Sequence, residues 1–552
     1  MSELTDYEYL LTLTEGVRYN AKGKNINLKG DGSDETEKFQ EMLNRAQTEG
    51  KLNVYFPKGV YGIRNVVQIF SNTHIEMHEE AVIKMIGNDL KMITFGELNN
   101  PNFATGYNGA HDISIKGGTL DGNGVSTLLL GIGHTKNLLF ESVRFINTRN
   151  GHSVECNSSY NVQFIRCTFE NMVSVTSTNR EFLQLDFASA AGFPSFGAYD
   201  YTPCSNILID GCAFKNGDNG IGCHSGYIDD AGNEFFHENI RITNCNFENV
   251  KYAIRVQSFK NSTVSGNTIN DADMGIIILS NENTVISNNT IQNTISDGIR
   301  IYNGQNSTTG FNRSSYRNIV ANNVLVNLGQ NGIRMSNAHS NLIANNIIKN
   351  VSKEGLFMID SHKNHINNIV VEGAAQLTSG SYSCFRIESS NDNVLNNIRA
   401  DNTTYPKNYY YGLYIASGQR NHISEYNFMP GESTFNNGII SGELANNVSN
   451  GEWVQLFTGD LGTNGASGTL LMDINIFSSI LIVANDNNSS AAQTVTMEIP
   501  KPIYKIGTAS RHRIVPDSNS GDRVDFSFIN SKTIQVDSIQ GTGHIRMVLG
   551  RM

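Results

Sequence analysis

Short stretches in which apolar and polar residues alternate recur along most of the chain, and turns separate them. Three of these stretches share one phrase, in which an Asn, alternating apolar residues, a Cys and a second Asn follow in order: 161–171, 206–216 and 239–249. Alternation at every second residue sends successive side chains to opposite faces of a strand. The pattern therefore predicts many short β-strands, each with one buried face.

The turn after these strands returns with a basic interval of 22 residues, lengthened in places by insertions. Such a unit is too short for a propeller blade and lacks the helical pattern of ankyrin or tetratricopeptide repeats. It fits one coil of a parallel β-helix, whose coils stack about 4.8 Å apart. We expect the turn residues to form ladders, with their cysteines buried and not nucleophilic. The turn positions are Gly118, Val143, Cys167, Cys212, Cys245, Asn267, Asn289, Asn323, Asn346, Asn368 and Asn397.

The two ends of the chain depart from this repeat. Residues 1–62 include an acidic stretch and then a helix-like pattern to about residue 47, which predicts a helix that caps the open end of the coils. From residue 448 the repeat stops, and strands separated by polar turns predict a β-sandwich over 448–552. The coils, and with them the candidate site, are predicted for 63–447.

Two motifs add a resemblance to a known fold family. Gly30-Asp31-Gly32, a short helix and Phe56-Pro57-Lys58-Gly59-Val60-Tyr61 stand in that order, and a Gly-Gly-Thr-Leu-Asp-Gly-Asn-Gly stretch occupies 117–124. This arrangement resembles the N-terminal signature and early coils of the pectate-lyase-like superfamily of right-handed parallel β-helices. The resemblance implies an all-β fold over about residues 25–430. It implies little about chemistry, because the superfamily includes hydrolases, lyases, epimerases and binding proteins.

Polar residues on the outward face of successive strands form the candidate catalytic site. Alternation predicts that Glu155, Asp186 and His224 follow one another on neighbouring coils, about one inter-strand spacing apart. Two close carboxylates disfavour double ionisation, so the pKa of one of them rises, as a general acid requires. A polygalacturonase-like pattern, matched only in part, adds Glu181 and Asp218 as weaker catalytic candidates. That family's other motifs are absent here, so its mechanism is not transferred.

The same face and its loops supply candidate substrate-binding residues. Insertions follow three neighbouring strands, at 187–203, 226–238 and 304–315, and we expect them to build the walls of a groove. Aromatic residues in the first two insertions suit the apolar faces of sugar rings. The predicted binding residues are Gln184, Arg255, Gln257, Arg300, Tyr302, Tyr199 and Tyr227.

Composition excludes several classes of partner. A formal net charge of −11 argues against nucleic acid, and no apolar run is long enough to insert in a membrane. The first residues lack the pattern of a signal peptide, and the seven cysteines show no metal-ligand spacing. We predict no metal and no cofactor.

Three classes of function remain open. The first is an extracellular glycan depolymerase that resembles a bacteriophage tailspike or appendage protein. The resemblance implies a homotrimer on the virion tail that acts on a bacterial surface polysaccharide or teichoic acid. Hydrolysis is favoured over β-elimination on a uronate-containing glycan, for which His224 with Arg255 would serve. The second class is a non-catalytic carbohydrate-binding adhesin, and the third is a purely structural spike.

Overall fold

The computed structural model describes most of the chain, in two units. Contacts divide the chain into Met1–Lys349 and Asn350–Met552, which are treated separately. The described residues are 9–10, 17–96, 104–172, 180–190, 198–224, 226–229, 231–306, 310–378, 381–401, 409, 411–428, 439–441, 448–449, 453–463, 465–470, 479–486, 494–500, 512–517, 522–530, 532–540 and 543–551.

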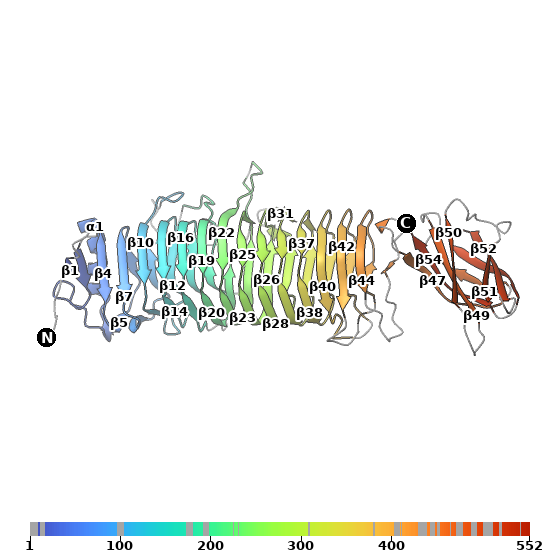
Figure 1. The fold of residues 1–552 in the computed structure, drawn as a ribbon. Helices are drawn as coiled ribbons and strands as arrows, with labels where there is room; N and C mark the ends of the chain where they lie inside the picture. Colours follow the sequence, from blue (N-terminus) through green and yellow to red (C-terminus); the bar gives the residue numbers. More distant parts are fainter. Residues whose placement is uncertain are drawn as a thin grey trace. The chain divides into compact units, whose positions relative to one another are not determined.

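The first unit is a stack of coils whose short strands form three parallel ladders (Figure 1). The first ladder contains β4 (Leu52–Phe56), β7 (Thr73–Met77), β10 (His111–Lys116), β13 (Lys136–Glu141), β16 (Tyr160–Ile165), β19 (Ser205–Asp210), β22 (His237–Thr243), β25 (Thr263–Ser265), β27 (Val285–Ser287), β33 (Ile319–Ala321) and β37 (Leu342–Ala344). The second contains β5 (Gly59–Ile63), β8 (Ala81–Met85), β11 (Thr119–Asp121), β14 (Arg144–Ile146), β17 (Thr168–Glu170), β20 (Ala213–Gly217), β23 (Asn246–Gln257), β26 (Thr268–Leu279), β28 (Thr290–Thr294) and β34 (Val324–Leu328).

The third ladder carries the candidate site. It contains β6 (Val67–Ile69), β9 (Lys91–Phe95), β12 (Leu128–Gly133), β15 (His152–Asn157), β18 (Glu181–Gln184), β21 (Asn219–Gly222), the second halves of β23 and β26, β29 (Ile299–Tyr302) and β35 (Ile333–Ser336). Parallel pairing already includes β4 and β5, ahead of residue 63. The division into three domains, 1–62, 63–447 and 448–552, remains a prediction.

Helix α1 (Thr36–Glu49) packs beside the first coils (Figure 1). Its buried residues Phe39, Met42, Leu43 and Ala46 recur at helical spacing and so form one apolar stripe. The Phe39 ring lies 5.4 Å from that of Phe56 on β4. The helix ends at Gly50, whose φ of 80° is the left-handed conformation that glycine adopts without a steric penalty.

Identical side chains stack along the interior of the coils. Phe145, Phe169, Phe214 and Phe247 follow one another with ring centroids 4.7 to 4.8 Å apart. Each ring is fully buried, and such stacked pairs contribute about 0.5–1.5 kcal/mol beyond the burial of their area. The one-coil spacing of these rings holds neighbouring strands in register, and that register positions the polar outward residues.

Most of the turn positions form the predicted ladder, but Asn368 and Asn397 are exposed and lie outside it, where Asn397 donates to Asn368 at 2.7 Å. Cys167, Cys212 and Cys245 are buried, and the Sγ atom of each lies near backbone carbonyl oxygens. Asn267, Asn289, Asn323 and Asn346 continue the ladder, because each amide nitrogen donates to the side-chain oxygen of the next at 2.9 Å. Buried amides that bond to one another and to backbone satisfy the polar groups of each turn.

The second unit contains further parallel coils and two antiparallel sheets. The coil strands are β39 (Leu356–Ile359), β41 (Phe385–Glu388), β43 (Leu413–Ile415) and β45 (Ile439–Ser441), with β40 (His365–Glu372), β42 (Val394–Asp401), β44 (His422–Phe428) and β46 (Val448–Ser449). One antiparallel sheet has the order β47 (Trp453–Leu461), β54 (Gly543–Arg551), β49 (Ser479–Asp486), β50 (Thr494–Pro500), and the other β48 (Ser467–Thr469), β53 (Thr533–Gln540), β52 (Asp522–Asn530), β51 (His512–Asp517). Strands of the two sheets contact one another, as in a sandwich.

The predicted fold class is confirmed, since strands of a parallel β-helix make up most of the described chain. Within that part, no helix is long and apolar enough to cross a membrane.

Candidate active site

The third ladder brings together four of the predicted catalytic side chains: Glu155, Glu181, Asp186 and His224. The register between β15 and β18 differs from the predicted one. Glu155 on β15 pairs with Gln184 on β18, and Gln184 pairs with Gly222 on β21. The prediction placed Glu155 directly beside Asp186, so it was two residues out of register there. Leu183 and Leu185 are equally apolar, so the pattern fits either of them opposite Val154. Alternation predicts which face of the strand a residue lies on, and a shift of two residues leaves that face unchanged.

Asp186 and His224 lie side by side, each two residues beyond the ladder pair of Gln184 and Gly222. One Asp186 oxygen accepts the backbone N–H of His224 at 2.8 Å, and the other contacts the His224 ring at Nδ1. The Gln184 amide nitrogen donates to that second oxygen at 2.6 Å. The Asp186 side chain is only 2% exposed, whereas that of His224 is 42% exposed. His224 is therefore the solvent-facing member of this ion pair.

A second ion pair lies beside the first and includes a residue that the sequence did not reveal. The Nδ1 atom of His152 is 3.2 Å from Glu181 Oε2, and its Nε2 atom is 3.9 Å from Glu155 Oε1. Asn219 donates to the other Glu181 oxygen at 3.2 Å. The His152 ring also lies edge to face with that of His224, with centroids 6.2 Å apart. His152 links the two carboxylates and places all of these groups in one cluster.

His152 is not among the predicted site residues, because it has the parity of the inward Val154 and Cys156. The only signal available beforehand was a His three residues before Glu155 at the start of a strand.

Burial and neighbouring charges separate the pKa values in this cluster. Burial raises the pKa of Glu155, with a smaller contribution from the Asp186 carboxylate. Burial also acts to raise the pKa of Glu181, but the hydrogen bond and charge of His152 outweigh it and hold this pKa at about 2. Glu155 thus retains its proton longer than an ordinary glutamate, while Glu181 is ionised.

The two histidines are shifted in the opposite sense to most buried imidazoles. The Asp186 charge raises the pKa of His224 to about 9. Burial acts to lower the pKa of His152, yet the hydrogen bond and charge of Glu181, with Glu155, raise it overall. The His224 imidazole is therefore cationic near neutral pH, and His152 keeps its proton to a higher pH than an ordinary histidine does.

Gln184 Oε1 makes no hydrogen bond to any residue that the structure describes, and the polar contact of Glu181 Oε2 within that part of the chain is with His152 Nδ1 at 3.2 Å. Buried acceptors in native proteins nearly always have a donor. A glycine keeps space around Glu181, since a Cβ atom on Gly222 would lie 2.5 Å from Glu181 Cγ. These oxygens suit the O–H groups of a sugar or of a water molecule.

The predicted binding residues divide into those near the cluster and those further along the outward face. Gln184 and Gln257 are almost fully buried. Arg255 pairs in register with Gly222 and donates to the Cys223 carbonyl oxygen at 2.7 Å. Further along, the Arg300 guanidinium lies 5.1 Å from the Tyr302 ring and is held by the buried Asp297 at 2.6 Å.

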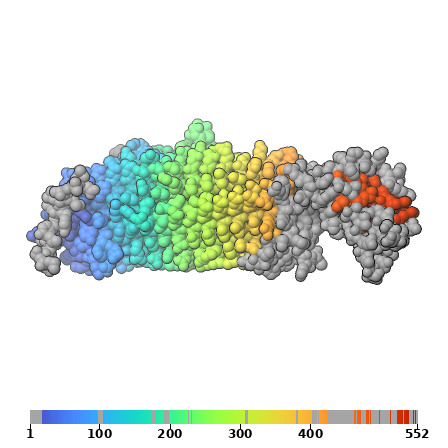
Figure 2. Space-filling view, viewed as in Figure 1, coloured from blue at the N-terminus to red at the C-terminus, as the bar shows by residue number. Residues whose placement is uncertain are grey.

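The two predicted loop aromatics differ in exposure. Tyr199 is 43% exposed, but Tyr227 is only 6% exposed. The Tyr227 hydroxyl is 2.9 Å from that of Ser189, and its ring packs against Phe187 and Tyr201. Tyr227 therefore holds its loop to the body and offers little ring surface to a sugar, which corrects its predicted role. Residues 231–236 of this loop include Glu234, which Arg313 on β31 (Phe311–Arg313) binds at 2.6 Å. A loop in the green part of the chain projects from the coils (Figure 2).

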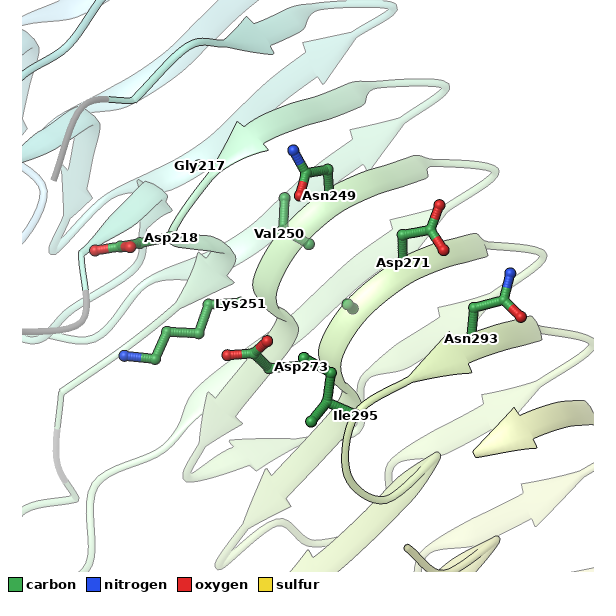
Figure 3. A pocket seen from close by; sticks show the side chains of 10 residues that line it. Gly217, Asp218, Asn249, Val250, Lys251, Asp271, Asp273, Asn293 and Ile295 are labelled. Carbon is green, nitrogen blue, oxygen red and sulfur yellow. The ribbon is translucent and has the colours of Figure 1, made fainter. Parts of the chain in front are cut away.

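Asp218 lies apart from the cluster. It lines an open pocket of about 460 Å³ on neighbouring coils, together with Lys251, Asp271 and Asp273 (Figure 3). Among the described residues, the hydrogen bonds and ion pairs of the cluster do not involve the Asp218 side chain. The geometry therefore separates Asp218 from the other predicted catalytic residues. Nor does the described part of the chain contain a group of three or more His, Cys, Asp or Glu side chains that could hold a metal ion.

Comparisons with known proteins identify the fold. The family model described as "Right handed beta helix region" matches residues 194–317 and 238–383. A mutant of the tailspike protein of E. coli bacteriophage HK620, solved in complex with a pentasaccharide, is 10% identical with a TM-score of 0.54, and the match covers 100% of this chain and 97% of that one. The chain is thus a right-handed parallel β-helix protein, as its sequence motifs predicted.

A curated relative comes from Streptococcus pneumoniae (strain ATCC BAA-255 / R6). Its "Plasmin and fibronectin-binding protein A" is 27% identical over 279 residues, which are 44% of this chain and 38% of the relative. The crystal structure of PfbA, a surface adhesin of Streptococcus pneumoniae, is 21% identical with a TM-score of 0.49 and covers 65% of this chain and 92% of that one. The match to the curated relative spans well under half of that protein's length.

Proposed function

We propose that this protein is a glycan depolymerase that hydrolyses glycosidic bonds of a bacterial surface polysaccharide. The observation that carries the proposal is the cluster in which Glu155 has a raised pKa while the neighbouring Glu181 is held at about 2. Hydrolysis of a glycosidic bond requires one carboxyl group that donates a proton and one carboxylate that accepts one.

Each residue of the cluster has a role in this proposal. Glu155, the more exposed of the two glutamates at 16%, protonates the leaving glycosidic oxygen. Glu181 accepts a proton from the attacking water at Oε2, whose polar contact among the described residues is with His152 Nδ1 at 3.2 Å. His152 keeps Glu181 ionised, and Asp186 orients the His224 imidazolium toward the substrate.

The same charges make β-elimination on a uronate the weaker candidate. An elimination requires an unprotonated base at the carbon acid, and the sequence offered His224 beside Arg255 for this step. Because Asp186 raises the pKa of His224 to about 9, that imidazole carries a proton near neutral pH and cannot act as the base. Product that absorbs in the ultraviolet as an unsaturated uronate would contradict hydrolysis.

A non-catalytic adhesin is the second candidate, favoured by the similarity to a plasmin- and fibronectin-binding protein. Asp186→Asn separates the two functions, because it removes the charge that keeps His224 protonated but preserves the side-chain shape. An enzyme loses most of its turnover and keeps its glycan affinity. An adhesin has no turnover in either form, and a purely structural spike binds no glycan.

The setting of the protein is part of the proposal. A fold like that of a phage tailspike supports a location on a virion tail or another extracellular surface, with polysaccharide or teichoic acid as the ligand. It also supports a homotrimer, as is usual for tailspikes of this shape. Incubation with a panel of capsular polysaccharides, exopolysaccharides and teichoic acids, followed by mass analysis of the fragments, tests the substrate class.

A further inference from the structure

A row of aromatic and charged side chains lies on the outward face of the coils in the second unit. Phe357 on β39 pairs in register with Arg386 on β41, and Arg386 pairs with Tyr414 on β43. All three are partly exposed, while their strand neighbours Leu356, Phe385 and Leu413 are buried in the core. This row is the aromatic patch.

The rings of the patch are held in place by Arg386. Its guanidinium carbon lies 5.0 Å from the Phe357 ring and 5.9 Å from the Tyr414 ring. The Tyr411 ring stacks on that of Tyr414, with centroids 5.3 Å apart and planes inclined by 19°. Stacking between coils orders these side chains before a ligand arrives, so little rotamer entropy remains to be lost on binding.

Two carboxylates also hold the Arg386 guanidinium. Glu388 accepts from Arg386 at 2.8 Å, and the buried Glu354 lies 3.5 Å from it. Arg386 and Glu388 are 32% and 31% exposed, so each presents polar edges next to the rings. Two carboxyl groups around one guanidinium leave no excess of positive charge, which argues against nucleic acid or a strongly anionic glycan as the occupant.

We propose that the aromatic patch is a second carbohydrate-binding surface that takes uncharged sugar residues of a polysaccharide chain. The Tyr414 and Phe357 rings contact the apolar faces of the sugars, and Arg386 and Glu388 exchange hydrogen bonds with their hydroxyl groups. A protein or membrane partner would require a continuous apolar surface, which the central ion pairs interrupt. This surface does not depend on the cleavage proposed above.

The test uses the full chain with the Glu155→Gln change, so that a bound glycan is not cut. Tyr414→Leu keeps apolar bulk but removes the ring, and Tyr414→Phe restores the ring without its hydroxyl. Tyr160→Leu is the matched control, because Tyr160 is a 42% exposed ring on β16 of the first unit. Affinity electrophoresis measures retention by capsular polysaccharides, teichoic acids, cellohexaose, laminarihexaose and maltohexaose. Thermal unfolding checks that each variant is folded.

We expect at least one uncharged glycan to be retained, roughly three- to tenfold more weakly by Tyr414→Leu, with retention recovered in Tyr414→Phe and unchanged in Tyr160→Leu. Absence of retention, or equal retention by Tyr414→Leu, overturns the proposal. Should Tyr414→Leu fail to fold, the same comparison is made with Phe357→Leu. Cleavage by the chain with Glu155 intact is measured separately, so a negative result for cleavage does not bear on binding at the aromatic patch, and the reverse also holds.

Discussion

His152 determines the charge of the residue that we propose as the base. Its hydrogen bond and positive charge offset the burial that would otherwise raise the pKa of Glu181. In the native protein this pKa of about 2 means that Glu181 is ionised at any pH where the protein is assayed. The alkaline limb of activity is then set by Glu155, whose raised pKa marks the loss of the proton that it donates.

His152→Asn removes that positive charge, so burial then raises the pKa of Glu181 into the mildly acidic range. We expect a new acidic limb in the pH–rate profile, with turnover at pH 5 lower by about tenfold than at pH 7. A role confined to packing would lower turnover equally at both pH values. A profile with the native shape contradicts the assigned role.

His224 links the site to stability. Its folded pKa of about 9 lies above the ordinary value near 6.5, so the folded state binds the proton more tightly than the unfolded chain does. This contribution is complete below about pH 6.5 and is lost as pH rises through about 9. We expect the thermal unfolding temperature to fall over this window in the native protein and to fall less in His224→Gln. A larger fall in the unfolding temperature of His224→Gln than in that of the native protein would show that Asp186 does not hold the proton on His224.

At the scale of single elements, the buried Asn ladder is the feature that sequence reasoning described best. The interval of 22 residues and the shared turn position were enough to place Asn267, Asn289 and Asn323 on successive coils. The register of β15 against β18 could not be obtained this way, because the chain between them carries an insertion and alternation repeats every two residues.

The ladder also makes a prediction about stability. Asn289→Ala leaves the Val264 carbonyl oxygen and the backbone N–H of Asn267 without their partner. Each unsatisfied buried group costs about 1–3 kcal/mol, so we expect the two together to lower the free energy of unfolding by about 2–6 kcal/mol, seen as a lower unfolding temperature. Ser265→Ala, which removes a partly buried hydroxyl contact of 3.1 Å on a nearby strand, is the control and changes stability by less than about 1 kcal/mol. Equal effects of the two changes would contradict the proposed role of the ladder.

At the scale of the whole molecule, the fold was predictable and the function only in outline. A repeat of short alternating strands identifies a parallel β-helix, since each coil must bury its inner face against the next. The chemistry was less accessible, because its residues come from strands far apart in sequence. Glu155, Glu181, Asp186 and His224 were named in advance, but His152, which contacts both glutamates and helps to separate their pKa values, was not.

Assembly is a further expectation at this scale. If the protein assembles as tailspikes do, light scattering on the full chain gives three times the mass of one chain, and the value does not change on dilution. A mass equal to one chain contradicts the homotrimer.

The most direct test of the proposed hydrolysis is to measure the fragments that the protein forms from a polysaccharide. Native protein, Glu155→Gln and the control Glu141→Gln, which alters an exposed ion pair with Arg166, are incubated with the same polysaccharide, and new reducing ends are measured by mass analysis. We predict saturated fragments that have gained water from the native protein and the control, and turnover lower by about 10²–10⁴-fold in Glu155→Gln. Undiminished cleavage by Glu155→Gln, or no cleavage of any polysaccharide by the native protein, would contradict the account.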